Sequence, residues 1–187
     1  MAIITPRGAV VAPESALSRF TDGDITTLVA LRRQLHRHPE LSWKEYATSD
    51  RLAEVVESLG LTVRRVANTG VVARVPGRDP TAPVVAVRGD IDALPIQEET
   101  GLEFSSAVPG IMHACGHDVH AAWAIGAAMS LIREPARGDV LVVLQPAEEL
   151  GAGATAILAS GALDGVKAIF GGHVDRRFDQ GQVIAQA

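Results

Sequence analysis

The chain has 187 residues, a length that suits one domain, or one and a half at most. Hydrophobic residues make up 47% and charged residues 21%, which excludes wholesale disorder, collagen and coiled coil. The formal net charge of -5 gives no support for a nucleic-acid-binding surface, and the single cysteine excludes an internal disulfide framework. No apolar run approaches the roughly 20 residues that span a bilayer, and no signal-peptide pattern is present. We therefore expect a soluble, cytoplasmic protein.

Residues 1–22 have no clear periodicity and are predicted to form a loose lead-in. Apolar residues at helical spacing predict helices from about Asp22–Asp24 to Pro39, and over about Tyr46–Leu59, His117–Ile132 and Ala152–Ser160. Alternating or continuous apolar runs predict strands over Leu61–Val66, Gly70–Val75, Pro83–Arg88, Val140–Gln145 and Ala168–Gly171. The stretch Asp90–Ala114 is predicted to be a long loop, a feature that is usually functional in a compact domain.

The order of these elements predicts the fold class. From position 83 onward, strands and helices alternate, which indicates parallel strands joined by helical crossovers. We therefore expect an α/β fold with a mixed, largely parallel sheet and helices on both faces.

Polar residues that can bind metals follow each buried strand of this sheet. Asp90 and Asp92 follow the first run, Glu148 and Glu149 the second, and His173 the third. The segment His113–His120, which contains Cys115 and His117, opens a helix. Because functional sites form at the carboxyl ends of parallel strands, and neighbouring strands lie about 4.8 Å apart, these side chains can converge. Cys, His, Asp and Glu are the common ligands of Zn²⁺ and related ions, so the pattern predicts a metal site.

Each of these residues also has a simpler explanation when it is taken alone. Asp92 could cap a turn, Glu148 and Glu149 could be solvated carboxylates at a helix start, and Cys115 could be an inert apolar side chain. A solvated surface does not explain why all of them follow buried strands or open a helix. We expect Cys115 and His117 to be ligands, because they lie two residues apart at a loop-to-helix junction where the helix N-terminus favours the thiolate.

Two flanking histidines remain open at this point. His113 and His120 could support the ligands, contact a substrate, or be purely structural. The adjacent carboxylates Glu148 and Glu149 are expected to have two different roles. One carboxylate can bind metal, while its neighbour takes a proton from the water that the metal activates.

Together, five motifs resemble the amidohydrolase branch of the dinuclear metallopeptidase family. That branch includes aminoacylases, hippurate hydrolases, N-acyl-amino-acid amidohydrolases and indole-acetyl-amino-acid hydrolases. The resemblance covers about residues 28–185. Its motifs are LHRHPELSWKE (Leu35–Glu45), RGDIDALPIQE (Arg88–Glu98), MHACGHDVHAA (Met112–Ala122), LQPAEELGAGA (Leu144–Ala154) and GGHVDRR (Gly171–Arg177).

The resemblance implies a role for each matching residue. Cys115 would be a bridging metal ligand, and His117, Glu149 and His173 would be the other ligands of two divalent ions. Glu148 would be the general base and later the proton donor, and Asp92 would orient groups at the metal site. Asp90 stands where other branches have a metal-binding histidine. The ions could be zinc, manganese, cobalt or nickel.

The function implied is a metal-dependent hydrolase that cleaves the amide bond of N-acyl amino acids or small peptides. The expected partner is therefore a small molecule, with no nucleic acid and no membrane, and a homo-oligomer is possible. An alternative is a truncated, non-catalytic metal-binding remnant of the same fold. A redox protein based on Cys115 is disfavoured because a resolving cysteine is missing.

The chain departs from the family pattern in its length. Family members are longer: they continue into a satellite dimerisation domain and a C-terminal catalytic part that supplies one more histidine ligand. None of the 6 histidines here lies after His173. Residues 23–187 are therefore expected to be the N-terminal part of the catalytic domain. We expect this part alone to bind metal weakly, to hydrolyse poorly, and to expose an apolar edge strand.

Overall fold

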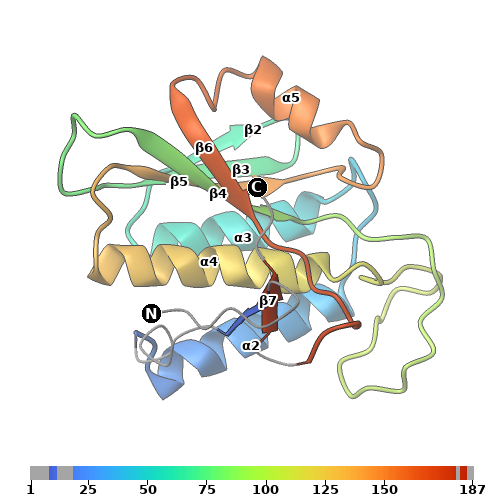
Figure 1. The fold of residues 1–187 in the computed structure, drawn as a ribbon. Helices are drawn as coiled ribbons and strands as arrows, with labels where there is room; N and C mark the ends of the chain where they lie inside the picture. The colour runs from blue at the N-terminus through green and yellow to red at the C-terminus, as the bar shows by residue number, and fades with distance from the viewer. Residues whose placement is uncertain (1–8, 12–18, 180–181, 185–187) are drawn as a thin grey trace.

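The computed structural model describes residues 9–11, 19–179 and 182–184, and a five-stranded mixed sheet lies at its centre (Figure 1). The helices are α2 (Asp22–Arg37), α3 (Tyr46–Ser58), α4 (His117–Arg133) and α5 (Gly153–Ala159). The strands are β1 (Ala9–Val11), β2 (Val63–Val66), β3 (Gly70–Val75), β4 (Val84–Asp90), β5 (Val140–Gln145), β6 (Val166–Gly171) and β7 (Gln182–Ile184).

The strand order in the central sheet is β2-β3-β5-β4-β6. β3 pairs antiparallel with both β2 and β5, whereas β4 pairs in parallel with both β5 and β6. Near the carboxyl ends of the parallel strands, Asp90 lies opposite Gln145 and Arg88 lies opposite Gly171. The segments that follow β4, β5 and β6 therefore leave the sheet at the same edge.

Helices cover both faces of this sheet (Figure 1). α3 and α4 pack on one face, with α2 against α4, and α5 packs on the opposite face. Side chains alternate along β5: Val142 and Leu144 join the core under α3 and α4, while Leu141 and Val143 join Ile157 of α5. β5 is thus buried on both faces, which explains its continuous apolar run.

The start of α2 is fixed by a capping box. The Thr21 hydroxyl accepts a hydrogen bond from the Asp24 backbone N–H at 3.2 Å, and the Thr21 backbone N–H donates to the Asp24 carboxylate at 2.7 Å. Arg133, the last residue of α4, donates to both Asp24 oxygens at 2.6 and 2.7 Å. This pair joins the start of α2 to the end of α4.

The predicted elements are confirmed to within a few residues, and so is the α/β class with a mixed sheet and helices on both faces. β4 continues two residues beyond its predicted end, and β6 starts two residues early. The antiparallel pair β1 and β7 was not predicted, and β1 lies in the predicted lead-in. Residues 1–8 and 12–18 of that lead-in fall outside the described residues.

β6 forms one edge of the sheet, as expected for an exposed apolar edge strand. Its residues Ile169 and Phe170 are 52% and 59% exposed, although both are large and apolar. Such surface normally lies against another segment or another molecule. Among the described helices, none combines the length and the apolar character that crossing a bilayer requires.

Candidate metal centre

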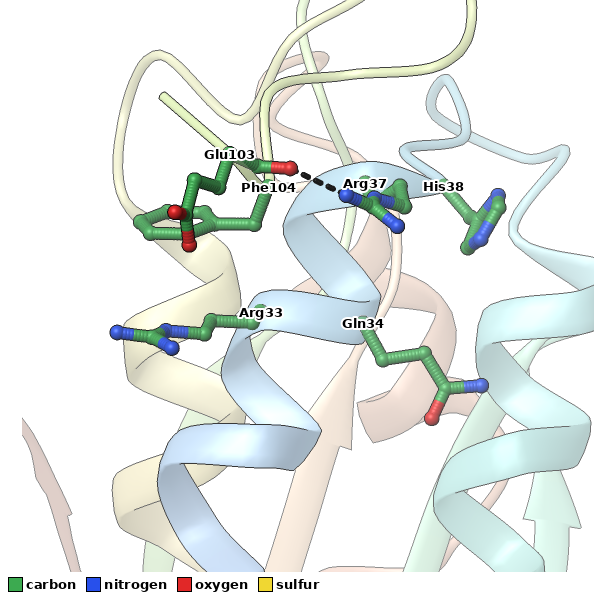
Figure 2. A pocket seen from close by; sticks show the side chains of 6 residues that line it. All are labelled: Arg33, Gln34, Arg37, His38, Glu103 and Phe104. Carbon is green, nitrogen blue, oxygen red and sulfur yellow. Dashed lines mark hydrogen bonds between the residues drawn. The ribbon is translucent and has the colours of Figure 1, made fainter. Parts of the chain in front are cut away.

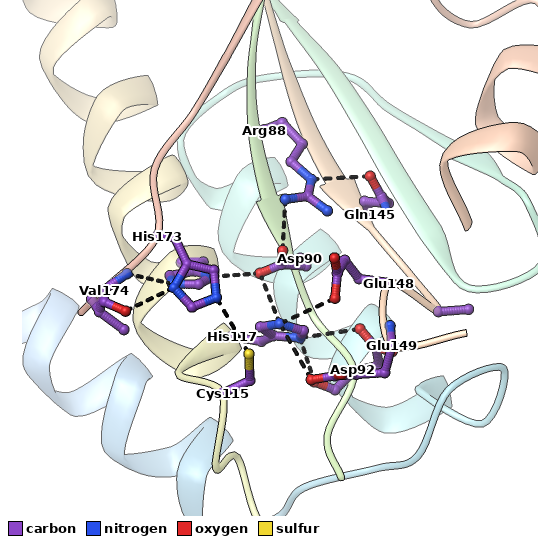
Figure 3. Close-up of polar contacts among 12 residues, drawn as sticks. Arg88, Asp90, Asp92, Cys115, His117, Gln145, Glu148, Glu149, His173 and Val174 are labelled. Atoms are coloured by element: carbon purple, nitrogen blue, oxygen red, sulfur yellow. Dashed lines mark hydrogen bonds and ion pairs between the residues drawn. The ribbon is translucent and has the colours of Figure 1, made fainter. Parts of the chain in front are cut away.

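The predicted metal-binding residues gather at the edge of the sheet where β4, β5 and β6 end (Figure 3). Glu148 and Glu149 follow β5, His173 follows β6, and His117 is the first residue of α4. Cys115 lies two residues before the helix, and Gly116 between them adopts φ 90, a left-handed conformation that glycine adopts without strain. This turn directs Cys115 and His117 toward the same place.

Two groups of side chains have donor atoms that all lie within 4.8 Å of one another, and both contain His117. One group is Cys115, His117 and His173, and the other is His117, Glu148 and Glu149. A third group of the same kind combines His117 with Asp90 and His120. The four residues expected to be ligands therefore converge from two strand ends, those of β5 and β6, and from the start of α4.

His117 lies at the centre of the cluster and is almost fully buried. Its Nδ1 donates to the backbone oxygen of Asp92 at 2.8 Å and lies 3.2 Å from the Asp92 carboxylate. Its Nε2 lies 3.7 Å from carboxylate oxygens of Asp90, Glu148 and Glu149, and has no hydrogen-bond partner among the described residues. Burial acts to lower the pKa of His117, but Asp92 and the other carboxylates outweigh it and raise the pKa.

A divalent cation fits this arrangement. A buried imidazole nitrogen without a partner faces several carboxylates, and a thiol and a second imidazole lie beside it. Uncompensated negative charge in a buried site is costly, and a bound cation would offset it. Nitrogen, sulfur and oxygen donors together suit Zn²⁺ and neighbouring transition metals.

Cys115 differs from the expectation in its charge state. Its Sγ lies 3.3 Å from His173 Nε2, so the side chain is placed as predicted. However, burial first, and then the nearby carboxylates of Glu149, Glu148 and Asp90, raise the pKa of the thiol to about 11. In the protein without a bound cation, burial and the surrounding carboxylates thus favour the neutral thiol, which is the opposite of the effect expected from the helix N-terminus.

Asp92 holds three parts of the site together. Besides its contacts with His117, its carboxylate accepts a hydrogen bond from the Ser42 hydroxyl at 2.7 Å and from the Glu149 backbone N–H at 3.1 Å. Burial acts to raise the pKa of Asp92, but the hydrogen bonds from His117, Ser42 and the backbone outweigh it and lower the pKa to about 2. The lowered pKa favours the ionised form of Asp92, and its carboxylate lies against the imidazole of His117.

His120 and Asp90 form a second support, on the side of His173. His120 Nδ1 donates to Asp90 Oδ1 at 2.6 Å, and His120 Nε2 accepts a hydrogen bond from the Val174 backbone N–H at 3.0 Å. Arg88 lies 2.7 Å from the other Asp90 oxygen. His120, whose role the sequence left open, therefore binds the backbone N–H of Val174, the residue next to His173.

His113, the other flanking histidine, is buried outside the cluster. Burial lowers its pKa to about 4, and neither ring nitrogen has a hydrogen-bond partner within the described part of the chain. Nearby, both ring nitrogens of His36 contact carboxylates, Asp118 at 2.9 Å and Glu98 at 3.1 Å. The hydrogen bond with Asp118 is the main cause that raises the pKa of His36, against the effect of burial.

A surface pocket near the end of α2 lies apart from this chemistry (Figure 2). It is lined by Arg33, Gln34, Arg37, His38, Glu103 and Phe104. Arg37 donates a hydrogen bond to the backbone oxygen of Glu103. The lining contains none of the predicted site residues.

Sequence reasoning missed two residues that support the site, Ser42 and Glu45. Both belong to the motif Leu35–Glu45, which carried the family resemblance but received no chemical role. Glu45 is completely buried and accepts hydrogen bonds from Thr69 and from the backbone of Ala147. The motif itself was the available signal, because it ends in an acidic residue just before a predicted helix.

Comparison with known proteins gives consistent results. The family model described as "Peptidase family M20/M25/M40" matches residues 86–185. The chain is 49% identical over 152 residues to an N-acetylcysteine deacetylase of Bacillus subtilis, covering 79% of this chain and 40% of that protein. It is 43% identical over 171 residues to an N-acyl-L-amino acid amidohydrolase of Geobacillus stearothermophilus, covering 89% of this chain and 46% of that protein.

Among solved structures, the fold is similar to that of a dinuclear metal-binding peptidase of the M20 family from Bacillus subtilis. The TM-score is 0.80 at 47% sequence identity, and the match covers 83% of this chain and 44% of that chain. The chain thus spans less than half the length of the curated relatives named here.

Proposed function

The chain belongs to the peptidase family M20/M25/M40, and from this membership we propose that it is the N-terminal catalytic part of a metal-dependent amidohydrolase. The proposed reaction is hydrolysis of the amide bond of N-acyl amino acids or small peptides. The observation that carries the proposal is the convergence of thiol, imidazole and carboxylate donors around the buried Nε2 of His117. The names of the relatives, a deacetylase of N-acetylcysteine and an amidohydrolase of N-acyl amino acids, support the substrate class.

In this proposal, Cys115, His117, Glu149 and His173 would hold two divalent ions. Zinc, manganese, cobalt and nickel all suit the donor set. When bound, the ions would lower the pKa of a water molecule and polarise the amide carbonyl. The solved peptidase of the same family, described as dinuclear, supports the number of ions.

Glu148 is the proposed general base. Its side chain is 39% exposed, against 21% for Glu149, so Glu148 is the more accessible of the two to water and substrate. The backbone N–H of Glu149 also donates a hydrogen bond to the Asp92 carboxylate at 3.1 Å. Glu148 takes a proton from the attacking water and later delivers it to the leaving amine nitrogen, while Glu149 serves as a metal ligand.

A matched pair of substitutions tests this division. In the complete protein, Glu148→Gln is expected to lower turnover of an N-acyl amino acid by about 10²–10⁴-fold, the usual contribution of general acid–base catalysis. Its metal content after dialysis should equal that of the wild type, because the amide removes only the proton acceptor. Glu149→Gln should instead lose metal and activity together. Loss of metal in the Glu148 variant would make Glu148 a ligand and contradict the assignment.

The second candidate, a metal-binding remnant without catalysis, is favoured by the open side of the site. His173 is exposed, so water reaches that part of the cluster. Water weakens the electrostatic stabilisation that amide hydrolysis needs. The test is an assay of the 187-residue chain with an N-acyl amino acid and added Zn²⁺, Mn²⁺ or Co²⁺. Turnover near about 10 s⁻¹, typical of enzymes, would exclude the remnant.

A further inference from the structure

Glu45 is a buried carboxylate that lies outside the proposed metal ligands but contacts the turn that carries two acidic site residues. It precedes α3, is 0% exposed, and accepts a hydrogen bond from the Thr69 hydroxyl at 2.7 Å. Its other oxygen accepts a hydrogen bond from the backbone N–H of Ala147 at 2.8 Å. A buried carboxylate is retained only where hydrogen bonds compensate its desolvation, and here one of the two bonds reaches the turn after β5.

Ala147 has a conformation that its own chemistry does not favour. Its φ is 46, in the left-handed region that residues with a Cβ rarely adopt. Such a conformation persists only where surrounding contacts determine it. Glu45 supplies the acceptor for the Ala147 N–H, and the Ala147 carbonyl accepts hydrogen bonds from Ala152 and Gly153 at 3.3 and 3.1 Å.

The turn packs closely against the first residue of α5. A Cβ at Gly153 would lie 1.6 Å from the backbone oxygen of Pro146, so the two backbones are already in contact. Glu148 is the next residue after Ala147, and the Glu149 N–H donates to Asp92 at 3.1 Å. Two buried carboxylates, Glu45 and Asp92, thus hold the backbone N–H groups on either side of Glu148.

We propose that Glu45 is a positioning residue, which fixes the backbone of the turn at 146–149 and thereby the side chains of Glu148 and Glu149. The catalytic consequence rests on the function proposed above, whereas the effect on the backbone does not. A displacement of about 1 Å at a reacting group can cost about 100-fold in rate. Loss of the Glu45 carboxylate should therefore reduce turnover far more than loss of an apolar residue nearby.

The test compares three variants of the complete protein. Glu45→Ala leaves the Ala147 N–H without its acceptor and should lower kcat by about 100-fold, with KM changed less than about threefold. Glu45→Gln should recover most of this loss, because its amide oxygen can accept from Ala147 and its amino group can donate to Thr69. Leu52→Ala removes a fully buried side chain of α3 and is the control for destabilisation alone.

Hydrogen exchange of the peptide that contains Ala147 gives a readout independent of activity. Exchange should be slow in the wild type and in Glu45→Gln, and faster in Glu45→Ala but not in Leu52→Ala. If Glu45→Ala does not fold, Glu45→Asp, which shortens the side chain by one methylene, replaces it with the same expectations. Unchanged exchange and kcat in the Glu45 variant, or an equal loss of kcat in Leu52→Ala, would overturn the proposal.

The two measurements also separate this inference from the proposed function. If the wild type does not hydrolyse N-acyl amino acids, the proposed function fails, and exchange alone then decides the role of Glu45. If the wild type is active and exchange at Ala147 does not depend on Glu45, the function stands and the positioning role is overturned.

Discussion

Replacing Asp92 by Asn should destabilise the metal-free protein, because no other side chain makes the contacts that its carboxylate makes. The carboxylate accepts hydrogen bonds from Ser42 and from the Glu149 backbone and also faces His117 Nδ1. An amide has only one accepting oxygen, so its amino group must face one of these donors. The Asn variant therefore resembles the protonated form of Asp92, and it replaces the negative charge beside these donors by a neutral amide.

The pKa of Asp92 gives the size of the effect. The difference between an ordinary pKa of 3.8 and about 2 in the folded protein corresponds to about 2 kcal/mol of stability. Because the folded-state pKa is lowered, this contribution is complete well above pH 3.8 and is lost as the pH falls through about 2. At pH 3 it should be roughly half its value at pH 7.

The assay is urea unfolding in the presence of a chelator at pH 7, 5 and 3. The control is Asp50→Asn, which removes an exposed carboxylate that pairs with Arg65 at 2.7 Å and should cost at most about 1 kcal/mol. The reasoning would be refuted if Asp92→Asn lowered the free energy of unfolding at pH 7 by no more than the control variant does. It would also be refuted if the difference in free energy of unfolding between wild type and Asp92→Asn did not decrease from pH 5 to pH 3.

Two further predictions concern the packing around the site. The folded-state pKa of His36 is raised, so its contribution is complete below about pH 6.5 and is lost as the pH rises through the folded-state value. His36→Gln should therefore lower the free energy of unfolding more at pH 6 than at pH 9, and an equal loss at both would contradict its pairing with Asp118. A Cβ at Gly89 would lie 2.4 Å from the backbone oxygen of His120, so Gly89→Ala should cost about 1–3 kcal/mol in urea unfolding. Gly23→Ala, whose Cβ meets nothing closer than 3.6 Å, is the matched control and should cost nothing, so equal effects would contradict the close packing of β4 on α4.

Much of the fold could be predicted because burial leaves a pattern in the sequence. β5 is buried at all six positions and is apolar throughout up to Gln145, so its bounds were predicted without error. The strand order could not be predicted, because an apolar run does not reveal its partner. β6 follows β5 in the chain but pairs with β4. β1 and β7 have three residues each, which is too short for any periodicity to appear.

The site was predictable to the extent that it depends on strand ends. Glu149 follows the buried strand β5, and His173 follows β6, which was expected to be buried but is exposed in this chain. Parallel pairing of β4 with β5 and β6 still brings these positions together. The role of Glu45 was not predictable, because it acts on a backbone N–H 102 residues away. The raised pKa of the Cys115 thiol was also not predictable, because it depends on burial and on carboxylates that follow other strands.

The central claim is that Cys115, His117, Glu149 and His173 bind divalent metal, and titration of the metal-free protein with Co²⁺ tests it most directly. Cys115 is the only cysteine, so any sulfur-to-cobalt charge-transfer absorption must come from it. The account predicts that this absorption rises to saturation in the wild type and is absent in Cys115→Ser. Saturable Co²⁺ binding without the absorption, or no binding at all, would contradict the claim.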